Sequence, residues 1–260
     1  MNRLMKAEFY RFIHTGNFFG YVIFMTILFA VVPFLTNIEN MGMTLGGLLG
    51  MDIDKVVTGP VSVDFTVMLG MMIIPPAIAA VSGQLYNKGK LGNYEVMTGS
   101  RPSRIILSKI FTDGLIFFIA SIIGLMTFYI YIAVVNGVGG FDHAAGRLAL
   151  ALILLAQVCS ASVMIMMIER RPGIGAVMCY VRFMLFDTMC LPCLMFFAGT
   201  LGYEKLALHL AHMSIINKIQ MVLHSDITTM QIMHTIFGFI AEFILWYVII
   251  YRKHKNKKFD

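Results

Sequence analysis

Six blocks of apolar residues dominate the chain, and short polar segments separate them. The blocks run from Phe18 to Leu35, Phe65 to Gly83, Phe111 to Val135, Leu148 to Ile168, Gly175 to Gly199 and Thr235 to Tyr251. A helix crosses the hydrocarbon core of a bilayer in about 20 apolar residues, and each block is close to that length. The pattern therefore predicts an all-α integral membrane protein with six transmembrane helices.

An amphipathic pattern precedes the first block. Apolar residues at helical spacing share one face: Met5, Phe9, Phe12 and Ile13. Basic residues gather on the other face: Arg3, Lys6, Arg11 and His14. A helix of this kind lies in the plane of the membrane interface. We therefore expect one domain, with an interfacial helix at residues 1–17, a six-span bundle at 18–251 and a basic tail at 252–260.

Composition and charge agree with a membrane location. Hydrophobic residues make up 58% of the chain and charged residues 13%, which leaves too little polar surface to cover a water-soluble globule. The net charge of +6 does not indicate a nucleic-acid partner, because the basic residues flank apolar blocks and no groove of stacking aromatics accompanies them. The bilayer is the partner that these residues predict.

The distribution of Lys and Arg predicts the topology. The N-terminal segment, the second and fourth connections and the C-terminal tail together carry 15 of these residues, whereas the other connections carry 4. Cytosolic loops are enriched in Lys and Arg. Both termini are therefore expected in the cytosol, in a multi-pass protein of the cytoplasmic membrane.

The longest polar interval, Gln84 to Lys109, falls on the cytosolic side of this layout. A short helical patch begins at Asn93 and ends at Gly99. Ser100 and Pro102 then provide an N-cap and an early-helix proline for the helix that follows. The sequence thus predicts a short cytosolic helix between the second and third spans.

Ionisable residues inside the predicted spans need a reason, because a charge near the bilayer centre is costly. Arg182 and Asp187 are five residues apart, about 140° on an α-helix, so we do not expect them to pair. Glu242 lies at a similar depth in the sixth span, and we expect an interhelical Arg182–Glu242 bridge. The bridge is either a structural pair or part of a substrate or proton pathway. Asp113, one turn into the third span, is expected at the membrane boundary, within reach of water.

Candidate metal and redox residues give no site that the pattern supports. His209 and His212 have a metal-binding spacing but no third ligand nearby. Cys190 and Cys193 have redox spacing but lie in an apolar span. All His residues are expected in loops or tails, which argues against an intramembrane protease. We therefore expect neither cofactor nor catalytic residues.

No phosphate-binding loop is recognisable. The nearest candidate, Gly89-Lys90, is followed by Leu91 where Ser or Thr is needed, and no strand precedes it. If ATP drives this protein, another subunit binds it.

The N-terminal MKAEFYRFI, the cytosolic segment NYEVMTGSRPSRIILSK and the layout of the spans resemble the permease subunits of type-2 ATP-binding-cassette exporters, of the bacteriocin-immunity or multidrug type. Residues 86–90 depart from the acidic and Gly-Thr pattern that members often show. The resemblance implies that the cytosolic helix is a coupling helix that docks in an ATPase subunit. The implied coupling residues are Asn93, Tyr94, Glu95, Gly99, Ser100, Arg101 and Lys109.

The resemblance also implies partners and cargo. Two permease copies, identical or related, form the pathway between them, and the cargo is an antimicrobial peptide or an amphiphilic drug. A self-sufficient six-span secondary transporter or channel, and a membrane scaffold or sensor, stay open as alternatives.

Overall fold

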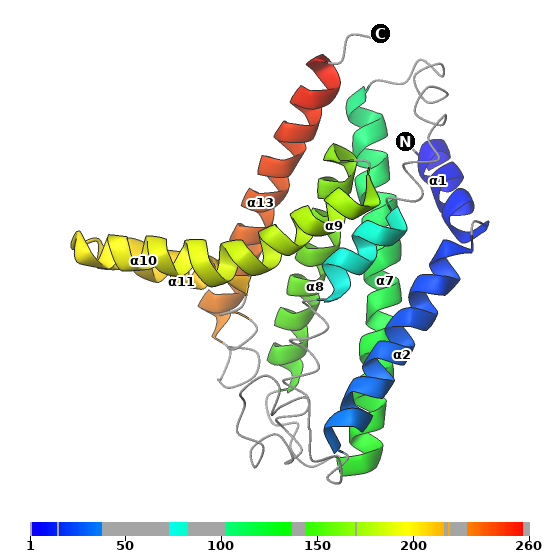
Figure 1. Cartoon of the computed structure of the whole chain (residues 1–260), viewed down its shortest axis with the longest axis horizontal. Coiled ribbons are helices and arrows are strands. Elements are labelled where there is room, and N and C mark those ends of the chain that lie inside the picture. Colours follow the sequence, from blue (N-terminus) through cyan, green and yellow to red (C-terminus); the bar gives the residue numbers. More distant parts are fainter. Residues whose placement is uncertain are drawn as a thin grey trace.

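The computed structural model describes residues 2–14, 16–37, 73–82, 102–136, 144–169, 171–215, 218 and 228–256 (Figure 1). The secondary structure of these residues is helical, which confirms the predicted class. The helices are α1 (Asn2–His14), α2 (Asn17–Asn37), α7 (Pro102–Asn136), α8 (Ala144–Ile168), α9 (Pro172–Tyr180), the π-helix η1 (Val181–Cys190), α10 (Leu191–Thr200), α11 (Glu204–Met213) and α13 (Thr229–Asn256). A further helical stretch covers Ile73–Ser82.

Among the residues that the structure describes, four helices are long enough and apolar enough to cross a membrane. Their apolar stretches are Ser103–Gly124, Ala149–Ile168, Pro172–Thr200 and Thr229–Lys253. They match the third to sixth predicted blocks. Two shorter apolar stretches, Phe18–Leu28 and Ile73–Ser82, lie inside the first and second blocks.

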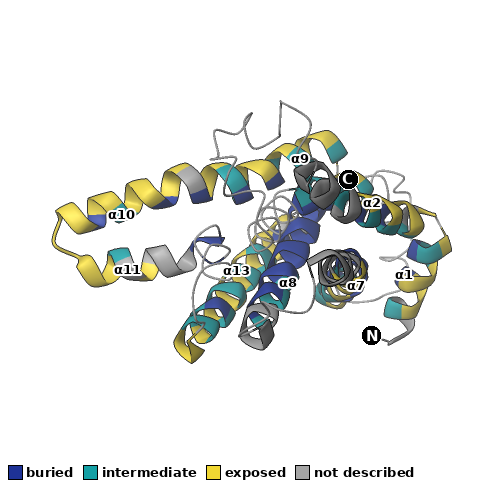
Figure 2. Cartoon of the chain, turned by 90° about the horizontal axis from the view of Figure 1, so that it is seen from below, coloured by how far each residue is buried: buried dark blue, intermediate teal, exposed yellow. Residues whose placement is uncertain are grey.

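Helix α8 lies at the centre of the fold, between α7 and α13 (Figure 2). An unbroken buried run extends from Gln157 to Met167, because neighbouring helices cover α8 on all sides. Small residues allow this close packing. Gly114 of α7 lies so near α8 that a Cβ atom there would be 3.9 Å from Ser160 Cα.

An aromatic cluster joins α1 and α2 to α7. The ring of Phe117 meets the rings of Phe12 and Tyr21 edge to face, at centroid distances of 5.1 Å and 4.9 Å. All three side chains are fully or almost fully buried. The Tyr21 hydroxyl lies 2.9 Å from the Ser121 hydroxyl, so its polar end is satisfied within the core.

The fifth predicted span forms one continuous rod, from α9 through η1 to α10. This rod lies across the other long helices instead of along them, and α10 projects from the body with α11 folded back beside it (Figures 1 and 2). Gly202, with φ of +79°, supplies the left-handed turn between the two helices. Most of the rod is exposed, which is consistent with a helix that is apolar on all sides and has no single stripe to fix its orientation.

The start of α1 and the end of α13 lie at one end of the structure, together with the start of α7 (Figure 1). At this end Lys253 of α13 donates a hydrogen bond to the backbone carbonyl of Ile168, in the last turn of α8. The last carbonyl groups of a helix have no partner within the helix, and a basic side chain can satisfy them. The contact joins the last turn of α8 to the C-terminal part of α13, which runs parallel to it.

Candidate functional site

A cluster of charged side chains lies where η1 crosses α13. Arg182 donates from Nε to Glu242 Oε1 at 2.7 Å and from Nη1 to Asp187 Oδ1 at 3.0 Å. The predicted bridge between Arg182 and Glu242 is therefore confirmed. One guanidinium group holds two carboxylates, which come from two different elements.

The prediction that Arg182 and Asp187 do not pair is wrong. It assumed an α-helix, in which residues five apart point in different directions. Val181–Cys190 instead forms a π-helix, whose hydrogen bonds join residues five apart. Side chains at i and i+5 therefore share a face, as those at i and i+4 do in an α-helix. The change of helix type brings Asp187 to Arg182.

Further partners saturate both carboxylates. Glu242 Oε2 accepts from Gln157 Nε2 at 2.6 Å, and Glu242 Oε1 accepts a second bond from Trp246 Nε1 at 3.2 Å. Asp187 Oδ2 accepts from the backbone N–H of Ile215 at 2.5 Å. Every carboxylate oxygen in the cluster thus has a donor. The cluster connects α8, η1 and α13 with the segment after α11.

Burial and neighbouring rings strengthen these contacts. The side chains of Asp187 and Glu242 are 1% and 9% exposed, and that of Arg182 is 19% exposed. The guanidinium carbon lies 5.3 Å and 5.2 Å from the ring centroids of Phe183 and Phe186. Coulomb attraction grows as water is excluded, and aromatic faces also attract the cation. A buried carboxylate that lost Arg182 would be left as an uncompensated charge.

Lys218 adds a second cation beside this cluster. Its side chain is 2% exposed, and Nζ has no hydrogen-bond partner within the described part of the chain. A Cβ atom built on Gly238, one turn before Glu242, would lie 3.2 Å from this Nζ. Burial lowers the pKa of Lys218 to about 8, although the nearby carboxylates of Glu242 and Asp187 favour its charged form. The formal charges of Arg182, Asp187, Glu242 and Lys218 sum to zero.

Sequence reasoning missed several members of this cluster. Gln157 is the only amide side chain in α8, and Trp246 stands one helical turn after Glu242. The sequence could therefore have indicated both residues as polar partners of Glu242. The N–H of Ile215 and the burial of Lys218 depend on how the segment after α11 folds back, for which the sequence pattern gives no rule.

Of the proposed coupling residues, only Lys109 lies within the described part of the chain. Asn93, Tyr94, Glu95, Gly99, Ser100 and Arg101 lie outside it. Lys109 stands in the first turns of α7, with Nζ 4.0 Å from Glu8 Oε1 of α1. Glu8 Oε2 also lies 2.5 Å from Arg11 Nη2. The helix that follows the proposed coupling segment is therefore joined to α1 by charge as well as by the aromatic cluster.

The expectation that water reaches Asp113 is wrong. The helix α7 begins at Pro102, nine residues before the predicted start of the span, so Asp113 stands three turns into it. Its side chain is fully buried. The predicted start was late because the polar residues before Phe111 hid the first turns of the helix.

The histidines of the second half are not all in loops. His209 lies in α11 and His234 in α13, with ring centroids 5.7 Å apart. No group of three His, Cys, Asp or Glu side chains is placed to hold a metal ion in the described residues. Cys190 and Cys193 are exposed free thiols at the junction of η1 and α10.

Comparisons with protein-family models, with curated proteins and with solved structures find no match to this chain. The geometry of the charged cluster is thus the main guide to function.

Proposed function

We propose that this chain is the membrane-spanning permease subunit of an ATP-driven exporter, with six spans and both termini in the cytosol. The observation that carries the proposal is the charged cluster of Arg182, Asp187 and Glu242, buried between apolar helices. Charged groups at membrane depth are costly, and they often mark substrate, ion or proton pathways. Because the sequence lacks a phosphate-binding loop, a separate ATPase subunit supplies the energy.

A continuous set of contacts supports coupling between the ATPase and the cluster. In this mechanism the ATPase binds residues 93–101 and moves them when it closes on ATP. The movement passes to α7 and, through Glu8, Lys109 and the Phe12–Phe117 contact, to α1. Helix α7 packs on α8, and Gln157 of α8 bonds to Glu242. Packed helices transmit such a displacement because they move as rigid bodies.

The exposed rod supports a second permease copy. Large apolar side chains of α10 and the turn that follows it, Phe196, Phe197 and Leu201, are 61–71% exposed. Apolar surface of this extent faces lipid or another protein. In the proposed exporter the second copy, identical or related, packs against this rod, and an amphiphilic peptide or drug crosses between the copies.

A self-sufficient, ion-coupled transporter is the second candidate function. The specific observation in its favour is the presence of two carboxylates and Lys218, all buried, in one region. Carboxylate chains of this kind relay protons in pumps and transporters. This function needs no ATPase, and Asp187 and Glu242 are then the coupling residues.

Co-purification in mild detergent tests the first function against the second. We expect an ATPase subunit to accompany the native chain and to be lost from a variant with Tyr94→Ala, Glu95→Ala and Arg101→Ala. Lys205→Ala, at an exposed position of α11, is the control and should retain the ATPase. Absence of an ATPase from the folded native chain would disprove the first function. Proton uptake into vesicles that is lost in Glu242→Gln would then support the second.

A further inference from the structure

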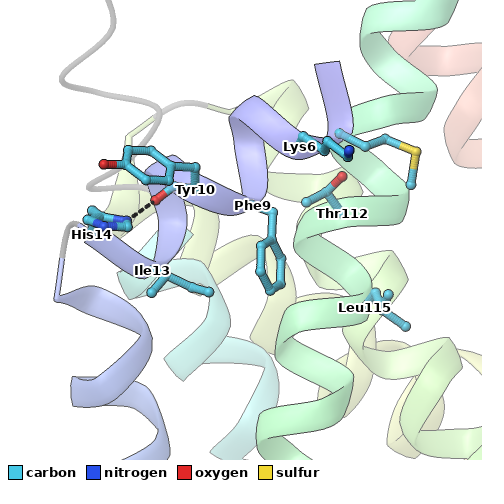
Figure 3. Close-up of a pocket in the computed structure, with 8 residues that line it drawn as sticks. Lys6, Phe9, Tyr10, Ile13, His14, Thr112 and Leu115 are labelled. Atoms are coloured by element: carbon cyan, nitrogen blue, oxygen red, sulfur yellow. Dashed lines mark hydrogen bonds between the residues drawn. The ribbon is translucent and has the colours of Figure 1, made fainter. Parts of the chain in front are cut away.

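An open groove of about 440 Å³ lies between α1 and α7 (Figure 3). Apolar side chains from both helices form most of its wall: Met5, Phe9, Ile13 and Leu115. Phe9 is 49% exposed and Leu115 is 53% exposed, so the groove is uncovered. The amphipathic pattern of α1 predicted this apolar face, but Phe12 leaves it and packs into the core instead. What remains is an apolar channel at the outer side of α1.

The polar groups of the groove gather at one end. Lys6 is exposed and lies beside Thr112 (Figure 3). Thr112 is 4% exposed, and its hydroxyl has no hydrogen-bond partner among the described residues. No carboxylate is among the eight residues that line the groove. Lys6 therefore presents an uncompensated positive charge above an unused hydroxyl group.

The other end of the groove is closed by α1 itself. His14 Nδ1 lies 2.9 Å from the carbonyl oxygen of Tyr10, so this nitrogen carries the proton and donates it. The two rings stack, with centroids 3.7 Å apart. The pair forms a flat wall at the end of α1.

We propose that this groove binds one anionic phospholipid of the cytosolic leaflet. The phosphate group lies against Lys6, an ester oxygen accepts a hydrogen bond from the Thr112 hydroxyl, and one acyl chain fills the channel over Phe9 and Leu115. A phospholipid carries a phosphate group, an ester and an acyl chain in the same order in which Lys6, Thr112 and the apolar wall follow one another along the groove. A single lysine without a neighbouring carboxylate selects a net negative head group.

An exposed apolar stripe on α7 gives the acyl chain a path out of the groove. Its members recur at helical spacing, are 36–53% exposed, and run away from α1: Leu115, Ile119, Ile123 and Met126. A stripe of this kind on a membrane helix faces lipid. The groove is thus the upper end of a continuous apolar surface. The proposal requires that the chain lies in a membrane, but it does not require that the chain exports anything.

Lipid retention by the full-length chain tests the proposal. The chain is purified in a nonionic detergent and titrated with dioleoylphosphatidylglycerol or with dioleoylphosphatidylcholine, and bound lipid is counted by native mass spectrometry. We expect one phosphatidylglycerol per chain, and weaker binding of phosphatidylcholine. Lys6→Gln should weaken phosphatidylglycerol binding about fivefold, the effect of one basic residue near an anionic lipid. Lys205→Gln, at an exposed position of α11, should change nothing.

Two further variants separate binding from folding. Leu115→Trp fills the channel from an exposed position, so the fold should be intact while both lipids are displaced. Thr112→Val keeps the side-chain volume and removes only the hydroxyl. In lipid-free detergent its Tm should equal or exceed that of the native chain, whereas phosphatidylglycerol should raise its Tm less.

Three results would overturn the proposal. In the first, the two lipids bind equally to the native chain. In the second, Lys6→Gln and Leu115→Trp both retain phosphatidylglycerol as the native chain does. In the third, Leu115→Trp converts a dimer to a monomer without loss of lipid, which would make the groove an interface between copies.

Discussion

Two ion clusters hold this chain together, and they use the same chemistry in different helix types. Glu8 and Arg11 pair three residues apart within the α-helix α1, and Lys109 adds a second cation at 4.0 Å. Arg182 and Asp187 pair five residues apart within the π-helix η1. A π-helix lengthens the spacing at which two side chains share a face. The same arginine–carboxylate pair therefore fits a different sequence spacing in each cluster.

The clusters also differ in how fully their polar atoms are bonded. Around Arg182 every carboxylate oxygen accepts a hydrogen bond from a donor in the chain. Arg11 Nε, by contrast, has no hydrogen-bond partner in the part of the chain that the structure describes, and Arg11 Nη2 meets Glu8 Oε2 as an ion pair without hydrogen-bond geometry. Both clusters are equally withdrawn from solvent within the chain, since the side chains of Glu8 and Glu242 are each 9% exposed. The Glu8 cluster is therefore the less completely hydrogen-bonded of two similarly buried clusters.

Removal of Arg182 should have the largest effect. Arg182→Met leaves Asp187 and Glu242 buried without their shared cation, which we expect to cost about 3–5 kcal/mol of stability. The Tm in detergent, followed by thermal shift, should fall on the order of 10 °C. Arg252→Met, at an exposed position near the end of α13, is the matched control and should leave the Tm unchanged.

A triple variant sharpens this result. Arg182→Met combined with Asp187→Asn and Glu242→Gln contains no buried charge from the cluster, so most of the lost stability should return. If the triple variant is as unstable as the single one, packing of the Arg182 stem and not charge compensation explains the loss.

We expect Lys218 to destabilise the fold, because its charged side chain is buried beside the cluster. Lys218→Met removes a charge that burial disfavours, and below pH 8 we expect a gain of about 2 kcal/mol. The pKa is about 8 in the folded chain and about 10.5 in the unfolded chain, where the side chain is exposed. Between these values the unfolded chain binds more protons, so the stability of the native chain rises with pH.

The measurement for Lys218 is the Tm of the native chain and of Lys218→Met from pH 7 to pH 10. The difference between the two should shrink as the pH rises above 8. Lys205→Met, which lies at an exposed position of α11, should show no such convergence. A difference that is constant over this range would mean that Lys218 does not titrate in the fold.

Sequence patterns predicted the helices well where a single period applied. Apolar length located α7, α8 and α13, and the charge depth of Arg182 and Glu242 predicted their bridge. The same reasoning failed at Asp187, because helix type decides which residues share a face and no residue pattern in Val181–Cys190 marks a π-helix.

The arrangement of the helices was less accessible from the sequence. Apart from Arg182 and Asp187 in η1, the rod from α9 to α10 is apolar on all sides, so its apolar pattern does not favour one packing direction over another. The buried position of Lys218 depends on how the segment after α11 packs against α13 near Gly238. The groove between α1 and α7 was hidden for a similar reason, since Phe12 and Phe9 have the same character but only Phe12 enters the core.

The smallest effect should come from Glu8. Glu8→Gln keeps the size of the side chain and removes its charge, so the ion pairs with Arg11 and Lys109 become weaker hydrogen bonds at a cost of about 1 kcal/mol. The side chains of Glu8 and Glu242 are equally buried, at 9% exposed each, so salt screens neither cluster strongly and the loss of each variant should change little when the Tm is measured in 1 M salt. Glu204→Gln, at an exposed position of α11, controls for the general effect of one removed charge. A loss for Glu8→Gln that disappears in 1 M salt, while the loss for Arg182→Met persists, would contradict this expectation and would show that water reaches the Glu8 cluster but not the Arg182 cluster.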